Sequence, residues 1–401
     1  MKNDVTIVGG GPAGMLMGLL LAKENIKVVV LEKNNSLKRD FRGETIAPGS
    51  VYILKMLGVY QELEKHGFIK VNKIKMYDQE KNLFNVDFNR FNHPQKYGID
   101  MPQPVVLEAI KRQAMKYPSF QYINGANCTD LIKENGKVVG VQYKHEGEIK
   151  KIHSQLVIGA EGRFSQLRSL AEYDVKKEEF SRDLIWFKVP KPLNWEEGNL
   201  IKVYKNDHVI ILPTYPNYLR VGTYISLGDN ANTKSKGLDS FIEKVSRIEP
   251  RLLTPMKDHI TSWKDTTLLK IFTAHVDKWA KDGIILIGDS AHTLSPILGQ
   301  GVNIAMQDAY ELTPYVVKGL SAYQNSPIPA SHFDEFVSKR KQQISFVSSF
   351  QARQEQNLAA SSPVECAIRK WKMKMLDRTP FKYTVMKKLQ YGIVANNKVE
   401  V

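Results

Sequence analysis

Three glycines near the N-terminus form the pattern Gly9-x-Gly11-x-x-Gly14, and an acid, Glu32, follows eighteen residues after the last glycine. The first glycine permits a tight turn, the second lets the backbone approach a pyrophosphate, and the third lets a helix pack closely on a strand. Amides at the start of that helix would hold phosphates, and the acid would accept hydrogen bonds from a ribose. The spacing therefore predicts a dinucleotide site, and its acid disfavours the 2′-phosphate of NADPH at this position. Pro12, Ala13 and Lys33 are expected to line the same site.

A second group of residues with chemical potential begins at Gly288-Asp289 and continues through Pro296, Gly299, Gly301, Val302 and Asn303. Asp289 directly follows an apolar run, so its carboxylate is expected where a buried strand ends. There it can accept hydrogen bonds from a polyol chain or orient phosphate contacts. The glycine-spaced segment Leu298–Val302 precedes a helix, whose free amides would stabilise negative charge nearby. The alternative is a connecting loop that glycines merely punctuate.

The elements that must position these residues can be read from hydrophobic periodicity. Val5–Val8 and Val28–Leu31 are apolar strand runs on either side of a helix at Met15–Lys23, which makes a βαβ unit with parallel strands. Further predicted elements are helices at 50–66, 103–116 and 302–318, a hairpin around Asn135-Gly136, and strands at 148–159, 209–214 and 219–225.

This order predicts an α/β fold with a Rossmann-like nucleotide-binding domain interrupted in sequence by a β-rich domain. We assign the nucleotide-binding domain to residues 1–72, 101–170 and 281–330. The β-rich substrate domain is assigned to residues 73–100 and 171–280, and a helical C-terminal region to residues 331–401.

Composition excludes several classes of protein. The 401 residues include 57 Lys and Arg against 42 Asp and Glu, a net charge of +15, and 42% are hydrophobic, which rules out wholesale disorder. Two cysteines, Cys128 and Cys366, leave no disulfide framework or multi-cysteine metal site, so we expect no metal and a reducing, cytoplasmic compartment. No apolar run approaches the roughly 18 residues of a spanning helix. The basic residues are scattered without a nucleic-acid-binding motif, so we expect no nucleic acid partner.

Four segments resemble one known family, the class A flavoprotein monooxygenases, which are the para-hydroxybenzoate hydroxylase-like enzymes that include ubiquinone-biosynthesis hydroxylases. Gly288–Asn303 resembles the family motif GDAAHxxxPxxGxGxN, with Ser290 replacing the usual alanine. Ala160–Arg168 is similar to DGxxSxxR, with Glu161 before Gly162 where the family has Asp. Arg42-Gly43-Glu44 resembles a loop whose arginine approaches the cofactor, and Gln103 falls where the family places an Arg or Gln beside the flavin. Beyond about residue 320 no resemblance is found.

The resemblance implies FAD as the cofactor and NADPH or NADH as a transient electron donor. It also implies transfer of one oxygen atom from O₂, through a flavin C4a-hydroperoxide, to a small aromatic, phenolic or quinone-like substrate. Pro296 and Leu298–Val302 would lie against the flavin ring. No catalytic acid or base is assigned, and His292 fits a packing role better than proton transfer. Substrate recognition is expected in the β-rich domain, where the aromatic candidates are Trp186, Phe187, Tyr204, Tyr215, Tyr218 and Tyr224.

Three alternatives stay open at this point. A flavin-dependent halogenase needs the pattern WxWxIP, and Asp183–Pro190 carries only Trp186, so halogenation is disfavoured. A reductase of a prenyl-type substrate would use the same scaffold without oxygen. A non-catalytic basic module that binds a membrane or nucleic acid would be colourless, because it holds no flavin.

The C-terminal segment Glu365–Val401 carries nine Lys and Arg against three acids, interleaved with aromatic and apolar residues. This pattern fits a helix lying on an anionic bilayer, at the inner face of the membrane. It also fits a helical cap that packs its apolar side on the FAD-binding domain, and we favour the cap. The oligomeric state is open.

Overall fold

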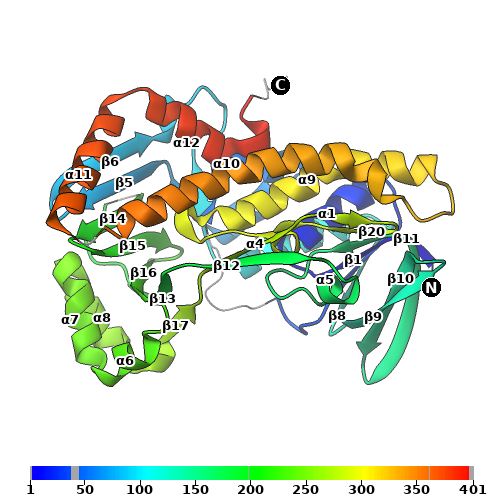
Figure 1. Ribbon diagram of the computed structural model, residues 1–401, viewed down its shortest axis with the longest axis horizontal. Helices are drawn as coiled ribbons and strands as arrows, with labels where there is room; N and C mark the ends of the chain where they lie inside the picture. The colour runs from blue at the N-terminus through cyan, green and yellow to red at the C-terminus, as the bar shows by residue number, and fades with distance from the viewer. Residues whose placement is uncertain (1, 38–44, 197, 361, 397–401) are drawn as a thin grey trace.

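The computed structural model describes residues 2–37, 45–196, 198–360 and 362–396, and it shows the predicted α/β architecture (Figure 1). Its central sheet has the strand order β19-β20-β11-β1-β2-β8, and every neighbouring pair from β20 to β8 is parallel. These strands are β1 (Lys2–Val8), β2 (Val28–Glu32), β8 (Phe120–Asn124), β11 (Glu148–Gly159), β19 (Ala280–Lys281) and β20 (Ile284–Leu286).

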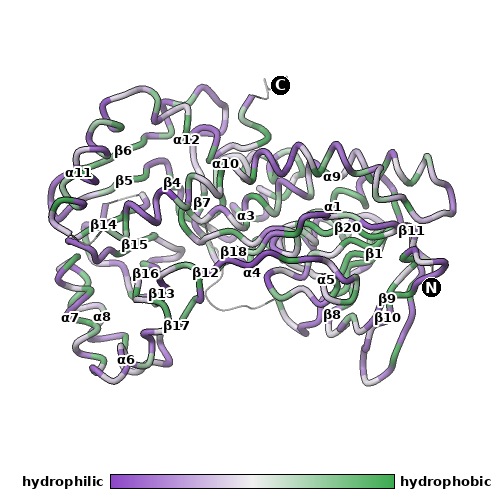
Figure 2. The backbone as a smooth tube through the Cα atoms, viewed as in Figure 1, coloured by the Kyte–Doolittle hydropathy of each residue, from purple (hydrophilic) through white to green (hydrophobic). Residues whose placement is uncertain are grey.

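The parallel strands are buried and mostly apolar at residues 5–8, 28–31 and 156–159, whereas β8 is partly exposed. All five residues of β2 are buried, as is almost every residue of helix α1 (Pro12–Lys23). Figure 2 shows hydrophobic residues concentrated along the strands around β1. Helix α1 begins inside the predicted glycine turn, three residues earlier than expected, because a proline is well suited to the first helical position.

The predicted hairpin is confirmed. β9 (Asn127–Glu134) and β10 (Lys137–His145) are joined by Asn135 at φ 49° and Gly136 at φ 78°, two left-handed residues as a tight hairpin turn requires. β10 then pairs antiparallel with the first half of β11, whose second half enters the parallel sheet. The long strand β11 therefore carries its last residue, Gly159, to the same edge as the ends of β1 and β2.

A second sheet of seven strands has the order β17-β13-β16-β15-β14-β5-β6. Its strands are β5 (Lys73–Asp78), β6 (Lys81–Asp87), β13 (Arg182–Pro190), β14 (Asn199–Tyr204), β15 (Asp207–Thr214), β16 (Tyr218–Ser226) and β17 (Thr266–Leu269). β5 and β6 come from a segment about 120 residues before β14, so this β-rich part is discontinuous in the sequence. One face packs on α7 (Leu238–Ile248) and α8 (Leu253–His259) in a cluster of its own. The domain boundaries given above stay predictions.

Shorter elements connect the two large sheets. One small sheet has the order β3 (Thr45–Ile46), β7 (Gly98–Asp100) and β4 (Ile69–Val71), and another has β12 (Val175–Glu179), β18 (Phe272–Val276) and β21 (His292–Thr293). Helices α4 (Gln103–Ala114), α5 (Gln166–Leu170) and α6 (Asn230–Ser235) also precede residue 300.

The prediction of a single helix over residues 50–66 is wrong. Two helices occupy this region, α2 (Pro48–Met56) and α3 (Tyr60–His66). They are separated at Gly58, whose φ of 70° no α-helix can contain. The apolar spacing continues across the break, which is why periodicity alone joined them.

Two long helices run side by side across the molecule, α9 (Gln300–Ala322) and α10 (Asp334–Leu358) (Figure 1). They are followed by α11 (Pro363–Arg378) and α12 (Phe381–Tyr391). The structure places α11 on β6 of the seven-stranded sheet and α12 on α2. The packing expected on the FAD-binding domain, to which residues 1–72 were assigned, is therefore made by α12 and not by α11. Within the described ranges, no helix is both long enough and apolar enough to cross a membrane.

A buried carboxylate joins α9 and α10. Asp308, fully buried on α9, accepts hydrogen bonds from Arg340 Nε at 2.7 Å and from the Gly288 amide at 2.8 Å, and lies 2.5 Å from His292 Nε2. Burial alone would raise the pKa of this carboxyl, but the charges of His292 and Arg340 hold the pKa below its usual value. The carboxylate therefore stays ionised at neutral pH.

Replacing Asp308 with Asn should lower the free energy of unfolding by about 3–5 kcal/mol, because it leaves Arg340 buried without a counter-charge. A group with a lowered pKa stabilises the fold above its unfolded value, near 4, and the stabilisation is lost as the pH falls through the folded value. Urea unfolding should therefore show the full difference at pH 7 and a smaller one below about pH 4. Asp174→Asn, at an exposed position, is the control and should change stability by less than about 0.5 kcal/mol. Equal stability of the two variants at pH 7 would contradict this account.

Candidate functional site

The carboxyl ends of four parallel strands meet at one edge of the central sheet, and each is followed by a residue singled out in the sequence. Gly9 follows β1, Glu32 ends β2, Ala160 follows β11, and Gly288 lies shortly after β20. A Cβ atom on Gly9 would lie 2.4 Å from the Ala160 carbonyl oxygen, so only glycine fits where β1 and β11 end. Such an edge is where ligands bind in open parallel sheets.

The glycine turn brings α1 directly over this edge. Gly9 has a φ of 110°, and a Cβ on Gly14 would lie 1.9 Å from the Gly9 carbonyl oxygen. Gly11 is the N-cap of α1 and, having no side chain, does not cap the amides of the first turn. Pro12 occupies the first turn, and Ala13 lies against the Gly288 backbone. The helix therefore presents amide donors and its positive dipole end at the sheet edge.

The predicted acid lies beside this turn. Glu32 is buried and accepts hydrogen bonds from the Gly10 amide at 2.9 Å and from the Asn34 amide at 3.0 Å. These bonds fix the carboxylate at the end of β2, and the neighbouring Lys33 is exposed. Arg42, the predicted phosphate or ribityl contact, lies outside the described residues. Gln103 is buried as the first residue of α4.

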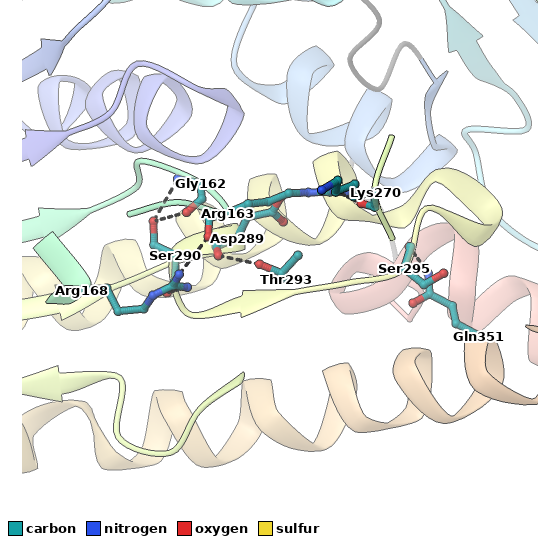
Figure 3. A network of polar contacts seen from close by, with 9 residues as sticks. All are labelled: Gly162, Arg163, Arg168, Lys270, Asp289, Ser290, Thr293, Ser295 and Gln351. Atoms are coloured by element: carbon teal, nitrogen blue, oxygen red, sulfur yellow. Dashed lines mark hydrogen bonds and ion pairs between the residues drawn. The ribbon is translucent and has the colours of Figure 1, made fainter. Parts of the chain in front are cut away.

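The second and third motifs contact each other through Ser290 (Figure 3). The Ser290 hydroxyl accepts a hydrogen bond from the Gly162 amide at 3.0 Å, and Arg168 donates to the Ser290 carbonyl at 3.3 Å. Ser290 replaces an alanine of the family motif, so the replacement adds a direct bond between the two loops. Arg163 lies 3.5 Å from Asp289, at Nε and Oδ2, and steadies that carboxylate at the sheet edge.

Glu161 supports its own helix. Its carboxylate accepts hydrogen bonds from the Ser165 hydroxyl at 2.6 Å and the Leu167 amide at 2.8 Å, at the start of α5. Burial raises the pKa of this carboxyl, and these hydrogen bonds oppose the rise. The acid therefore shapes the loop that carries Gly162.

A strained turn precedes α9. Leu298 and Gly299 both adopt left-handed conformations, with φ values of 63° and 60°, which is uncommon for leucine. Pro296 begins this turn, and the first amides of α9 have no side-chain cap among the described residues. Gly301 lies in the first turn of the helix, where a Cβ would lie 3.8 Å from Asp289 Oδ1. The turn therefore places free amides next to the Asp289 carboxylate.

Asn303 holds this turn in place from inside. Its side chain donates to the Gly299 carbonyl at 3.0 Å and the Thr45 carbonyl at 3.2 Å, and accepts from the Ala47 amide at 2.8 Å. The residue is fully buried, whereas Val302 beside it is half-buried. Asn303 thus orders the turn and ties it to the segment at Thr45–Ile46.

His292 is built into the core. Its ring lies 5.0 Å from that of Trp279, and its Nε2 is bonded to Asp308. This geometry agrees with the packing role expected from the sequence.

Three residues that contact the site were not found by sequence reasoning: Arg163, Asp308 and Gln351. Gln351 of α10 donates to the carbonyl oxygens of Ser295 and Ile297, at 2.9 and 2.7 Å, on the segment that leads into the strained turn. Only Arg163 had a usable signal, its place inside the Ala160–Arg168 motif. A buried glutamine on a polar helix leaves no trace in spacing or composition.

The donors present fit FAD. Uncapped helix starts at α1 and α9 suit a diphosphate and a ring that gains negative charge, and buried or half-buried carboxylates at Glu32 and Asp289 suit hydroxyl groups. Within the described residues, no group of three or more His, Cys, Asp and Glu side chains could hold a metal ion.

Replacing Asp289 with Ala should leave a folded protein whose dissociation constant for FAD rises about tenfold or more, because a charged acceptor for cofactor hydroxyls is lost. The constant is measured by quenching of FAD fluorescence on titration of the apoprotein. Asp277→Ala, at an exposed carboxylate, is the matched control and should bind FAD as the wild type does. Equal affinity in both variants would rule out the assigned role.

Comparison with known proteins identifies the family of this chain. Residues 2–342 match the model of the FAD binding domain family. The chain is 28% identical over 394 residues to 6-methylpretetramide 4-monooxygenase of Streptomyces rimosus, across 97% of this chain and 92% of that protein.

Two solved structures show the same fold. p-Nitrophenol 4-monooxygenase from Pseudomonas putida has a TM-score of 0.81 at 16% identity, covering 98% of this chain and 99% of that one. A flavin-dependent brominase has a TM-score of 0.78 at 20% identity, covering 98% of this chain and 94% of that one. The family match extends past residue 320, where the sequence motifs ended, into α10. The chain therefore belongs to the FAD binding domain family, and its resemblance to the class A flavoprotein monooxygenases is confirmed.

Proposed function

We propose that this protein is an FAD-dependent monooxygenase that uses NADPH or NADH and O₂ to hydroxylate a small aromatic, phenolic or quinone-like compound. The observation that carries the proposal is the meeting, at one sheet edge, of the glycine turn, Asp289 and the uncapped start of α9. The chain's relatedness along 97% of its length to a monooxygenase supports the same reaction type.

Each part of the edge has an assigned task. The α1 amides after Gly11 would hold the diphosphate, and Glu32 would lie at the adenosine ribose. Asp289 and Gln103 would contact the ribityl chain. The turn from Pro296 to Asn303 would lie against the ring. When bound, FAD would supply the electron transfer and the activation of O₂.

The chain's own contribution at the ring is electrostatic and steric. Free amides at the start of α9 would stabilise negative charge that develops on the ring, without needing a proton. Asn303 and Gln351 hold the turn from both ends, so these amides are fixed before a ligand arrives. A fixed donor stabilises charge better than a mobile one, because it needs no reorganisation.

The substrate is expected on the inner face of the seven-stranded sheet. Side chains alternate along β13, and Phe187 packs on the outer face in the cluster with α7 and α8, whereas Trp186 and Tyr224 cluster together on the opposite face. Arg182, at the start of β13, bonds Glu355 of α10 at 2.9 Å, so this inner face lies against α10. Tyr215 and Tyr218 are partly exposed at the strand ends and are poor pocket candidates.

The inner face carries polar atoms as well as rings. Tyr224 Oη, Trp186 Nε1 and His208 Nε2 are buried and have no hydrogen-bond partner among the described residues. Burial, followed by the charges of Arg182, Arg369 and Lys244, places the pKa of His208 well below its usual value, so the ring is neutral at pH 7. Buried polar groups normally have partners, so these three are suited to a hydroxyl or carbonyl on an aromatic substrate.

Halogenation stays disfavoured, although one solved relative is a brominase. β13 carries Trp186 alone, without the second tryptophan of the halogenase pattern.

We further propose a reducing, cytoplasmic compartment, which agrees with Cys128 and Cys366 both being free.

The proposal is tested by mixing the FAD-loaded protein with NADPH or NADH, without oxygen, across a panel of phenols, quinolones and quinones. At least one compound should speed flavin reduction, followed by absorbance, and hydroxylated product should appear only after O₂ is admitted. Tyr224→Phe should raise the compound concentration needed for half-maximal stimulation of flavin reduction by about 2–10-fold, because one hydrogen bond to the compound is lost. Tyr218→Phe, on the same strand but partly exposed, should match the wild type. Product formed without oxygen would refute oxygenation and favour the reductase.

A further inference from the structure

Helix α11 has one buried and one exposed apolar face. On the buried face, Met373 packs with Met76 and Leu83 of the seven-stranded sheet and with Leu358 of α10. Asp377 secures the same side by accepting a hydrogen bond from the Asn85 amide at 2.8 Å. This packing covers one face of α11, and the opposite face is not packed against another described element in this way.

The exposed face carries four large apolar side chains. Val364 is 68% exposed, Ile368 46%, Trp371 64% and Met375 45%. Their spacing of four, three and four residues places them in one stripe at 3.6 residues per turn, opposite Met373. A continuous exposed stripe of this kind marks an interaction surface more often than an isolated exposed residue does.

Basic residues flank the stripe on both sides. The helical repeat places Lys372 along one side and Lys374 and Arg378 along the other, and all three are exposed. Residues 363–391 carry a net charge of +6. An apolar stripe between rows of lysine and arginine is the arrangement of helices that lie in a membrane interface, where the charged ends reach the headgroups.

A cavity of about 410 Å³ opens beside the stripe, between the end of α10 and the start of α11. It is lined by Ile368 of the stripe, by Lys372, and by Arg369, which is only 2% exposed. The Arg369 guanidinium donates to the carbonyl oxygens of Lys205 and Asn357, while its Nε has no partner among the described residues.

No described carboxylate offsets this buried charge directly. Glu365 also lines the cavity, but its carboxylate caps α11 by accepting from the Ser362 amide at 3.0 Å. A buried guanidinium without a counter-ion is unfavourable, and an entering phosphate would supply one.

We propose that α11 docks on an anionic membrane surface, with its apolar stripe at the boundary between headgroups and acyl chains and a lipid phosphate in the cavity at Arg369 and Lys372. Lys374 and Arg378 contact neighbouring headgroups. A second copy of the chain is a poor occupant, because it would bring an equally basic surface against this one. The proposal is independent of the reaction and goes beyond it, since it concerns where the enzyme is held.

The test is sedimentation of the FAD-loaded full chain with vesicles of pure phosphatidylcholine or with about 30 mol% phosphatidylglycerol added. We expect binding at least about tenfold stronger to the anionic vesicles, weakened by high salt. The double variant Ile368→Ser/Trp371→Ser should lose about tenfold or more, and Lys372→Gln should lose several-fold. All of these positions are exposed or half-exposed, so the variants should fold and keep their flavin.

The matched controls are Ile149→Ser/Leu193→Ser, two exposed apolar residues elsewhere, and the exposed Lys151→Gln, and both should bind as the wild type does. Light scattering of the wild type and of the stripe variant, without vesicles, measures whether the protein forms a dimer through the stripe. Failure of the wild type to sediment with anionic vesicles, equal binding of the stripe variant, or a dimer that the stripe variant abolishes would each overturn the proposal.

Discussion

The fold depends on one buried carboxylate. Asp308 is fully buried on α9, where it is bonded to the Gly288 amide, to His292 and to Arg340 of α10. A buried carboxylate is tolerated only when its charge is offset and its oxygens are bonded, so the three partners must stay in place together. Their positions fix the end of β20, the loop that carries Asp289, and the approach of α10 to α9.

Helix α10 carries further buried polar side chains of this kind. Its buried face repeats every three or four residues and includes three polar side chains, Arg340, Gln351 and Glu355. Arg340 bonds the α9 core, Gln351 holds the segment before the strained turn, and Glu355 bonds Arg182 of the seven-stranded sheet. One helix thereby bonds both the segment before the strained turn and the seven-stranded sheet. Polar bonds at these points fix the register of α10 more narrowly than apolar contacts would, because a hydrogen bond joins specific atoms in a defined direction.

The glycine turn, Glu32 and the Gly288–Asn303 segment could be predicted from the sequence because the demands on the backbone are local. A Cβ at Gly9 or Gly14 meets another backbone atom, so residue type alone reveals the geometry. The break between α2 and α3 was missed because the apolar spacing runs through it. The role of Ser290 was missed because a hydrogen bond between segments far apart in sequence leaves no periodic signal. Glu161 was matched to a cofactor-binding motif, whereas its carboxylate bonds Ser165 and Leu167 of its own loop. The contribution of α10 was missed for the same reason, since a buried arginine and an exposed one look alike in a polar helix.

The central claim is that this chain arranges FAD, O₂ and an aromatic compound for oxygen transfer. Its most direct test is mass spectrometry of the product formed under ¹⁸O₂ in ordinary water, with a compound that stimulates flavin reduction. The account predicts one labelled oxygen atom in each product molecule. An unlabelled product, whose new oxygen atom would come from water, would contradict it.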